Sequence, residues 1–202
     1  MKVDVIKVGM FQTNCYLVYN DSEMLVIDPG ASFKKIDEAI QSHENVKVLA
    51  ILLTHGHFDH IGAADRLKEK YNCPIIASRD DEKILRNEKY NNLAGFAASV
   101  RSEVEWLEKD ELNLGSIKIR ILYTPGHSAG SVMYVIDNKL FSGDTLFRLS
   151  VGRTDLYSGS GYLLNQSLQK LFDLDRDMIV YPGHEASTTV GFELDYNPYI
   201  MK

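Results

Sequence analysis

The sequence is poor in cysteine and in positive charge, and it has no long apolar run. Two cysteines, Cys15 and Cys73, are too few for the disulfide framework of a small secreted protein, so we expect free thiols. The 22 Lys and Arg are outnumbered by 28 Asp and Glu, which argues against nucleic acid as a partner. No apolar stretch approaches the ~20 residues that span a membrane, and Lys2, Asp4 and Lys7 interrupt any N-terminal signal peptide. We therefore expect a cytoplasmic protein without a membrane partner.

The remaining composition is that of an ordinary globular protein, with 45% hydrophobic and 25% charged residues. A length of 202 residues suits one domain, so we interpret residues 1–202 as a single unit. Apolar runs and period-two alternation predict strands at 3–8, 14–19, 24–27, 46–53, 74–77, 117–121, 132–136, 139–141 and 178–181. Helical spacing predicts helices at 32–42, 61–71, 80–87 and 164–171. Interspersed strands and helices favour an α/β fold.

Four of the expected strands end in a short turn that leads directly to a His or an Asp. The four segments are His55-Gly-His-Phe-Asp-His60, Thr124-Pro-Gly-His127, Ser142-Gly-Asp144 and Pro182-Gly-His184. Ligands in α/β folds collect beyond the carboxyl ends of strands, so we expect these ends to converge on one site. Five of the six histidines belong to these segments, and only His43 does not.

The first segment has the residue types and spacing of a metal site. In an extended backbone, His55 and His57 project to the same side and can hold one metal ion. Asp59 and His60 fall at the start of the next helix, where they can reach a second ion. We expect Gly56 to allow a tight turn through a positive φ. Imidazole and carboxylate are the ligands expected for zinc or iron, which favours a metal centre over a solvated polar loop.

The first segment also determines how we interpret His127, Asp144 and His184. Alone, a histidine after a turn is an ordinary surface residue, and an aspartate there is an ordinary helix cap. Each of these three residues, however, follows a strand and a glycine-containing turn in the same way. We therefore interpret His127, Asp144 and His184 as further ligands of the same centre.

Other residues carry weaker signals. Arg153 and Tyr157 follow Asp144 and are candidates for substrate binding, although Arg153 suits a structural ion pair with Asp155 equally well. Residues 90–100 are interpreted either as an apolar lid over the site or as an ordinary core helix. Trp106 is expected in the core or at its margin.

The segments THGHFDH, TPGHSAGS, SGD and YPGHE, in this order, resemble the metallo-β-lactamase superfamily. The resemblance extends from Thr13 to Pro198. It is greatest to single-domain hydrolases similar to glyoxalase II, the hydroxyacylglutathione hydrolase. The segments Gly143–Phe147 and Gly152–Asp155 are typical both of that group and of persulfide dioxygenases. The resemblance implies an α/β fold of four layers, the αββα metallo-β-lactamase sandwich, with metals at one edge of two packed sheets.

The resemblance also implies a role for each ligand. One metal ion would be held by His55, His57 and His127, a second by Asp59, His60 and His184, and Asp144 would bridge the two. We expect two divalent ions, zinc first, with iron or manganese as alternatives. A hydroxide bridging ions ~3.5–4 Å apart, oriented by Asp59, would attack a carbonyl carbon. A thiolate leaves readily because a free thiol has a pKa of only ~8.5.

The expected function is hydrolysis of a small-molecule thioester or related acyl ester, of the hydroxyacylglutathione type. The alternatives are a persulfide dioxygenase with one iron on His55, His127 and Asp144, a lactonase, and a protein that binds metal or a partner without catalysis.

Departures from the family pattern narrow the choice. Asp144 stands where β-lactamases commonly carry Cys, and His57 stands where flavodiiron proteins carry Glu, so we expect neither antibiotic hydrolysis nor oxygen reduction. Many relatives have Gly where Glu185 stands. Only residues 185–202 follow His184, without the helical region that binds glutathione in full-length glyoxalase II. We therefore expect a smaller or different thiol carrier.

Overall fold

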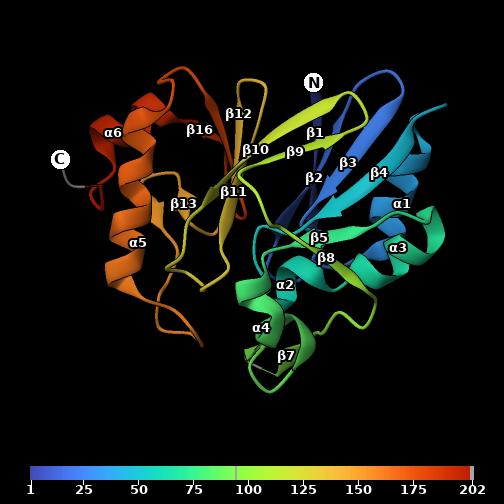
Figure 1. Ribbon diagram of the computed structural model, residues 1–202, viewed down its shortest axis with the longest axis horizontal. Helices are drawn as coiled ribbons and strands as arrows, with labels where there is room; N and C mark the ends of the chain where they lie inside the picture. The colour runs from blue at the N-terminus through green and yellow to red at the C-terminus, as the bar shows by residue number, and fades with distance from the viewer. Residues whose placement is uncertain (94, 201–202) are drawn as a thin grey trace.

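Two six-stranded sheets pack face to face in the computed structural model, which describes residues 1–93 and 95–200. Figure 1 shows helices α1 and α3 against the outer face of one sheet and helices α5 and α6 against the outer face of the other. The layers therefore follow the order helix, sheet, sheet, helix. This confirms the four-layer αββα sandwich of the metallo-β-lactamase type.

The first sheet combines antiparallel and parallel strands. Its spatial order is β1 (Lys2–Val8), β2 (Thr13–Tyr19), β3 (Glu23–Ile27), β4 (Lys47–Leu52), β5 (Ile75–Ala77) and β8 (Val104–Trp106). Strands β1 to β3 are antiparallel, whereas β3, β4, β5 and β8 run parallel. The carboxyl ends of β3 and β4 therefore lie at the same edge.

The second sheet sends three strands toward that edge. Its spatial order is β16 (Thr188–Thr189), β15 (Ile179–Pro182), β12 (Lys139–Gly143), β11 (Val132–Ile136), β10 (Ile117–Tyr123) and β9 (Glu111–Leu114). β11 is antiparallel to both β10 and β12, and β12 is parallel to β15. It follows that β10, β12 and β15 share one direction and end at one edge. The Val132 amide donates to the Thr54 carbonyl across the sheets at 2.8 Å, which joins this edge to the end of β4.

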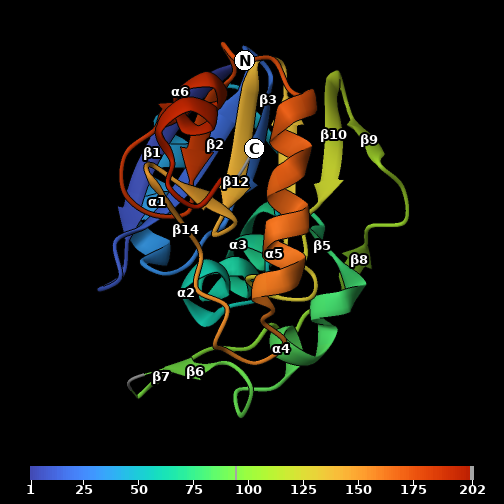
Figure 2. The same ribbon diagram turned by 90° about the vertical axis from the view of Figure 1, so that its left-hand side faces the viewer.

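The remaining elements cover the sheets or connect them. The helices are α1 (Phe33–Gln41), α2 (Phe58–Ile61), α3 (Ala64–Tyr71), α4 (Glu82–Arg86), α5 (Gly161–Leu168) and α6 (Val190–Tyr196), with 3₁₀ turns η1 (Arg79–Asp81) and η2 (Gln169–Asp173). Two small hairpins are formed by β6 (Asn92–Leu93) with β7 (Phe96–Ala97) and by β13 (Leu146–Phe147) with β14 (Ser150–Val151). Figure 2 shows the β6–β7 hairpin at the end of the molecule near α2 and α4.

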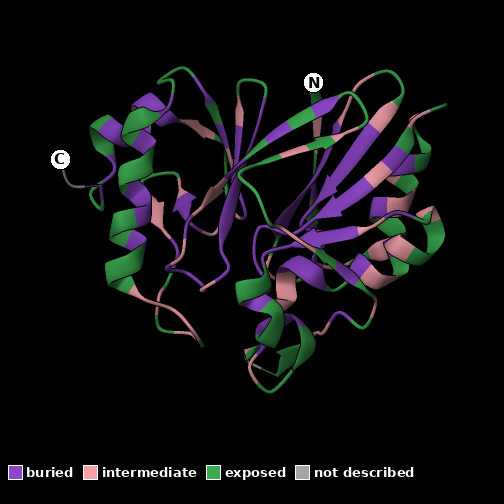
Figure 3. Ribbon diagram, viewed as in Figure 1, coloured by how far each residue is buried: buried purple, intermediate pink, exposed green. Residues whose placement is uncertain are grey.

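Three apolar clusters hold the layers together. The cluster between the sheets packs residues such as Leu25 and Leu52 of the first sheet against Ile119 and Phe141 of the second. One outer cluster buries the inner sides of α1 and α3, and the other buries those of α5 and α6. Figure 3 shows the buried positions concentrated along the strands and on the inner sides of the helices. Trp106 packs against the α1–α3 cluster, as the sequence predicts.

Two sequence predictions about secondary structure are wrong. Residues 61–71 do not form one helix: α2 ends at Ile61 and α3 begins at Ala64. The amides of Gly62 and Ala63 donate to the carbonyls of Gly30 and Pro29, at 3.0 and 2.8 Å, in place of helical bonds. These tertiary hydrogen bonds leave no periodicity in the sequence.

Strands β6 and β7 pair within this segment, at residues 92–93 and 96–97, so the core-helix interpretation of residues 90–100 fails. Phe96 is 39% exposed. Ala94 lies outside the described residues. The short strands β8, β9 and β16 are not predicted from the sequence, because segments of two to four residues give little periodicity.

Asp81 joins two loops at the edge where the strands end. Its carboxylate accepts from the Gly56 amide at 2.8 Å, the Gly130 amide at 2.7 Å and the Ser128 hydroxyl at 2.7 Å. The side chain is buried, and burial raises its pKa above the ordinary value despite these three donors. One buried carboxylate therefore fixes the loop after β4 against the loop after β10.

Within residues 1–93 and 95–200, no helix is both long enough and apolar enough to cross a membrane.

Replacing Asp81 with Ala leaves three buried donors without their acceptor, each costing about 1–3 kcal/mol. We expect Asp81→Ala to lower the free energy of unfolding in urea by about 3 kcal/mol or more. Asp80→Ala is the matched control because its neighbouring side chain is exposed, and it should stay within about 0.5 kcal/mol of the parent protein. Equal stability of the two variants would show that Asp81 does not hold the loop after β4 against the loop after β10.

Cys15 and Cys73 are both free and buried. Burial raises the pKa of the Cys73 thiol to about 11 and moves that of Cys15 in the same direction, so little thiolate is present at neutral pH. We expect both thiols to react with a colorimetric thiol reagent in denaturant without reductant, and to react slowly in the native protein. A Cys15–Cys73 disulfide in peptide mapping would contradict this.

Candidate metal centre

The four predicted strand-end segments converge at the edge of the sandwich beside α2. His55 and His57 follow β4, and α2 carries Asp59 and His60. The second sheet contributes three residues, which follow β10, β12 and β15: His127, Asp144 and His184. Figure 1 shows α2 next to the end of β4, at the lower edge of the sheets. All seven predicted ligands therefore lie in one region.

Three histidines form the first group. Single nitrogen atoms of His55, His57 and His127 all lie within 4.8 Å of one another. His57 Nδ1 is 2.8 Å from His127 Nε2, and the His55 ring lies edge-on to both. Three imidazoles facing a common point suit a divalent cation such as zinc.

Asp59, His60 and His184 form the second group. Their ligand atoms also lie within 4.8 Å of one another. Asp59 Oδ2 is 3.2 Å from His184 Nε2 and 3.7 Å from His60 Nε2. The Thr13 hydroxyl donates to the same Asp59 oxygen at 3.1 Å and so fixes the carboxylate.

Asp144 lies between the two groups. Its Oδ1 is 3.3 Å from His60 Nε2, and its Oδ2 is 3.6 Å from His127 Nε2 and 3.5 Å from His184 Nε2. One carboxylate thus contacts members of both groups. Gly183 makes this approach possible, because a Cβ at that position would lie 2.1 Å from Asp144 Oδ1.

Ligand atoms of a third group, Asp28, His55 and His60, also lie within 4.8 Å of one another. Asp28 is already fully engaged, however: it accepts from the Thr54 amide at 2.8 Å, the Thr54 hydroxyl at 2.6 Å and His60 Nδ1 at 2.9 Å. We therefore interpret Asp28 as a support behind the ligands.

Backbone carbonyls orient two of the histidines. His127 Nδ1 donates to the carbonyl of Arg153 at 2.7 Å, and His184 Nδ1 donates to the carbonyl of Phe11 at 3.1 Å. A carbonyl can only accept, so the proton sits on Nδ1 in both rings. Each Nε2 is left with a lone pair that faces the centre.

The same logic applies to the other pair. The Thr54 hydroxyl donates its hydrogen bond to Asp28, so it accepts a hydrogen bond from His55 Nδ1 at 3.1 Å. His60 Nδ1 donates to the same Asp28 carboxylate. His55 and His60 therefore also present Nε2 lone pairs, whereas His57 faces the group through Nδ1.

The electrostatics of the centre favour the protonation states that metal ligands need. Burial, followed by the neighbouring His127, lowers the pKa of His57 to about 3, and burial lowers that of His55 well below its ordinary value. Burial pushes the pKa of Asp144 upward, but the positive charge that His60 carries when protonated, 3.3 Å from Asp144 Oδ1, outweighs burial, so the pKa falls well below the usual range. The neutral rings of His55 and His57 and the ionised Asp144 therefore suit a cation. At His60 and His184 burial lowers the pKa, but the neighbouring Asp59 and Asp144 outweigh burial and raise it, so metal binding there must displace a proton.

Buried atoms test whether a cation fits. His55 Nε2, His60 Nε2 and Asp144 Oδ1 are buried and have no hydrogen-bond partner among the described residues. Buried polar atoms are almost always paired, since an unpaired one costs free energy. A divalent cation satisfies all three, so the residues present fit a metal.

The candidate substrate residues take different positions. The Arg153 guanidinium forms a two-pronged ion pair with the exposed Asp155, at 2.7 and 2.8 Å, while its carbonyl orients His127. Tyr157 packs against Tyr90 at 4.5 Å and, with His57, lines a cavity of about 330 Å³.

Sequence reasoning missed the supporting residues Asp28, Thr54 and Thr13. Asp28 follows β3 as the other ligands follow their strands, so the strand-end signal was present, although Asp28-Pro29-Gly30 is also ordinary turn chemistry. The expectation for Gly56 is wrong: it is not among the glycines with a positive φ. A Cβ there would lie 3.1–3.3 Å from Leu85, Asp81 and Ile84, so close packing explains this glycine.

Comparison with known proteins agrees with this geometry. Residues 8–184 match the model of the metallo-beta-lactamase superfamily. A probable metallo-hydrolase, YqgX of Bacillus subtilis (strain 168), is 38% identical, with 99% of this chain and 98% of that protein covered. The hydroxyacylglutathione hydrolase GloC of Haemophilus influenzae is 34% identical, with coverage of 99% and 98%.

Solved structures show the same fold. The BLEG-1 B3 metallo-beta-lactamase has a TM-score of 0.94 and 36% identity, with both chains covered completely. TTHA1623, in a di-iron-bound form, has a TM-score of 0.87 and 34% identity, with 98% of this chain and 100% of that chain covered. The first similarity means that the fold alone does not separate this chain from proteins called β-lactamases. The superfamily match over most of the chain, together with the converging histidines and aspartates, shows that this chain belongs to the metallo-β-lactamase superfamily of metal-dependent hydrolases.

Proposed function

We propose that the protein hydrolyses a small-molecule thioester, of the hydroxyacylglutathione type, with two divalent metal ions. The observation that carries this proposal is the position of Asp144, whose two oxygens contact members of both ligand groups. A bridging carboxylate between two complete ligand sets is the arrangement of two-metal hydrolases. Similarity to GloC of Haemophilus influenzae supports the thioester class.

Each ligand group would hold one ion. His55, His57 and His127 would hold the first, Asp59, His60 and His184 the second, and Asp144 both. When bound, the two ions supply a water-derived nucleophile at neutral pH and polarise the carbonyl oxygen. Zinc is the first candidate, and the di-iron form of TTHA1623 supports iron as the alternative.

The chain's own residues position the reactants. Asp59 is ionised, because the neighbouring rings of His60 and His184 outweigh the effect of burial and lower its pKa. Thr13 holds Asp59 Oδ2, so the carboxylate can accept a proton and orient the attacking oxygen. The thiolate product needs no acid residue, since its pKa lies near ~8.5. The cavity beside His57 and Tyr157 accommodates a polar thiol carrier.

A persulfide dioxygenase is the second candidate, with iron on His55, His127 and Asp144. Such an enzyme needs open positions on one iron for oxygen and sulfur. The compact second group of Asp59, His60 and His184 favours hydrolysis instead.

Metal content tests the dinuclear proposal. Elemental analysis of fully loaded protein should give about two ions per chain, as two-metal sites require. Asp144→Ala should lower the value to one or less, because both ions lose a ligand, while far-ultraviolet circular dichroism stays unchanged. Asp21→Ala, at a side chain 97% exposed, is the control and should keep both ions. A stable content of one ion in the parent protein would disprove the dinuclear centre.

Substrate class is tested with zinc-loaded and iron-loaded protein. We expect thiol release from S-lactoylglutathione, and we expect Asp59→Asn to slow it by about 10²-fold or more, because the amide cannot take a proton. Oxygen uptake with glutathione persulfide, and hydrolysis of a lactone and of a β-lactam, are measured in parallel. Oxygen uptake in the iron form without thioester cleavage in either form would favour the dioxygenase, and preferred cleavage of the lactone or β-lactam would replace the thioester.

A further inference from the structure

A second cavity, of about 460 Å³, also reaches the metal centre. It is bounded by the β1–β2 turn, the start of α1, α3 and the β6–β7 hairpin, and Thr13 and Asp59 form part of its wall. Of the candidate ligands Asp59 lines this cavity, and Asp59 Oδ2 lies 3.2 Å from His184 Nε2, so one wall of the cavity is formed by the second ligand group. A volume of this size is typical of small-molecule sites.

Four aromatic rings give this cavity an apolar wall. Phe11 packs edge to face against Phe58 at 5.2 Å and against Phe96 at 5.5 Å. Phe33 also lines the cavity, with the Arg66 guanidinium stacked on its ring at 4.0 Å. Phenylalanine rings provide no hydrogen-bond partner for a peptide-like or charged group, but they bury alkyl or aryl surface away from water.

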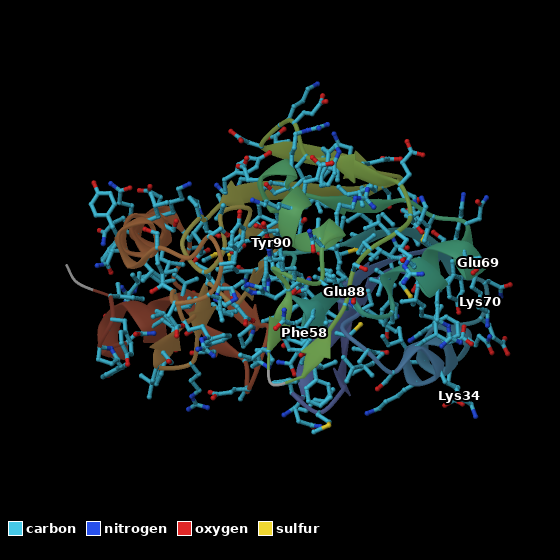
Figure 4. The ribbon with its side chains drawn as sticks, turned by 90° about the horizontal axis from the view of Figure 1, so that it is seen from below. Lys34, Phe58, Glu69, Lys70, Glu88 and Tyr90 are labelled. Atoms are coloured by element: carbon cyan, nitrogen blue, oxygen red, sulfur yellow. The ribbon has the colours of Figure 1, made fainter. Side chains whose placement is uncertain are left out.

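The cavity beside Tyr157 is the more polar of the two. Its lining includes Lys89, Asn92 and Asp155 beside apolar and aromatic side chains. Phe58 contributes to both cavities and therefore stands between them. Figure 4, which views the molecule from below, shows Phe58 between Tyr90 and the α1 segment that carries Lys34. Two cavities, one more polar and one more apolar, thus lie beside the centre and share Phe58 as a wall.

In a thioester, an acyl chain (the acyl arm) lies on one side of the reacting carbonyl and a thiol carrier lies on the other. An apolar acyl arm and a polar thiol carrier would match the two cavities. We propose that the 460 Å³ cavity binds the acyl arm, and that the protein selects thioesters with an apolar acyl chain of several carbons. This inference rests on the proposed function. The thiol carrier, which bears polar groups, lies in the cavity of Tyr157, and Phe96 is the specificity residue of the acyl cavity.

The chemistry of the side chains supports this division. Full burial of a methylene favours binding by about 0.8 kcal/mol, or about fourfold in affinity. Since this cavity is partly open to solvent, each added methylene should improve binding by about two- to fourfold until the cavity is full. A lactoyl group, which has a single methyl group, gains less from the phenylalanine wall than a longer apolar chain does, so we expect it to be cleaved less efficiently.

Binding of the hydrolysis product tests the cavity without any reaction. The probes are acetate, butanoate, hexanoate and octanoate, with dissociation constants measured by ligand-observed NMR on the metal-loaded protein. We expect the constants to fall about two- to fourfold per methylene. Phe96→Ala removes a wall, and Ala97→Trp, at an exposed position on the same hairpin, fills the space; both should flatten this dependence.

Phe172→Ala is the matched control, because Phe172 is a phenylalanine in η2 with 41% exposure, close to the 39% of Phe96. It should keep the chain-length dependence of the parent protein. Dissociation constants that do not change with chain length in the parent protein would overturn the proposal. A dependence that survives both Phe96→Ala and Ala97→Trp would also overturn it.

Turnover separates this inference from the proposed function. With S-acetyl-, S-butanoyl- and S-hexanoylglutathione, kcat/KM should rise with chain length in the parent protein and in Phe172→Ala, and stay level in Phe96→Ala. Absence of thiol release from every thioester, with chain-length-dependent binding of the carboxylates, would refute the proposed function and leave the apolar cavity established. Thiol release that is equal for all three acyl groups would refute acyl selection and leave the hydrolase.

Discussion

The centre depends on one buried carboxylate that is not itself a ligand. Asp28 accepts from the Thr54 amide, the Thr54 hydroxyl and His60 Nδ1, all within 2.9 Å. Through Thr54 it also sets the proton on His55. A single side chain at the end of β3 therefore fixes two histidines from the next loop and helix. Hydrogen bonds to a charged group in a buried setting are among the strongest in proteins, so the lone pairs are oriented before any metal arrives.

The sandwich makes this arrangement possible because it brings strand ends from two sheets to one edge. The Gly183 amide donates to the Gly143 carbonyl at 2.8 Å, and the Asn14 amide donates to the Gly183 carbonyl at 2.7 Å. These two bonds tie β15 to β12 and to the first sheet at the level of the ligands. Gly143 adopts a φ of +50°, and a Cβ there would lie 2.3 Å from the Thr54 hydroxyl. Close backbone approach, which only glycine permits, is thus part of the site.

The convergence of the seven candidate ligands could be predicted from the sequence because its signal is local. A strand followed by a turn and a His or Asp is visible without a structure, and the fold then brings the ends together. The break between α2 and α3 was invisible, since it arises from hydrogen bonds to the distant Gly30 and Pro29. The β6–β7 hairpin was missed because two-residue strands carry no periodicity. Glu185 adopts a φ of +67°, a conformation that glycine takes without steric cost, so the Gly that the family resemblance implies at this position would fit it.

The same geometry that prepares the centre for metal also weakens the fold without it. The rings of His55 and His60 lie 4.1 Å apart and those of His55 and His57 4.8 Å apart, all buried. Four buried atoms in this centre have no hydrogen-bond partner among the described residues, which is a cost that the apolar clusters must offset. A ligand that binds only the native state raises the free energy of unfolding. The increase grows with the logarithm of the ligand concentration divided by its dissociation constant. Metal binding and stability are therefore coupled through the same atoms, and the unfavourable packing of histidines is retained because it serves the site.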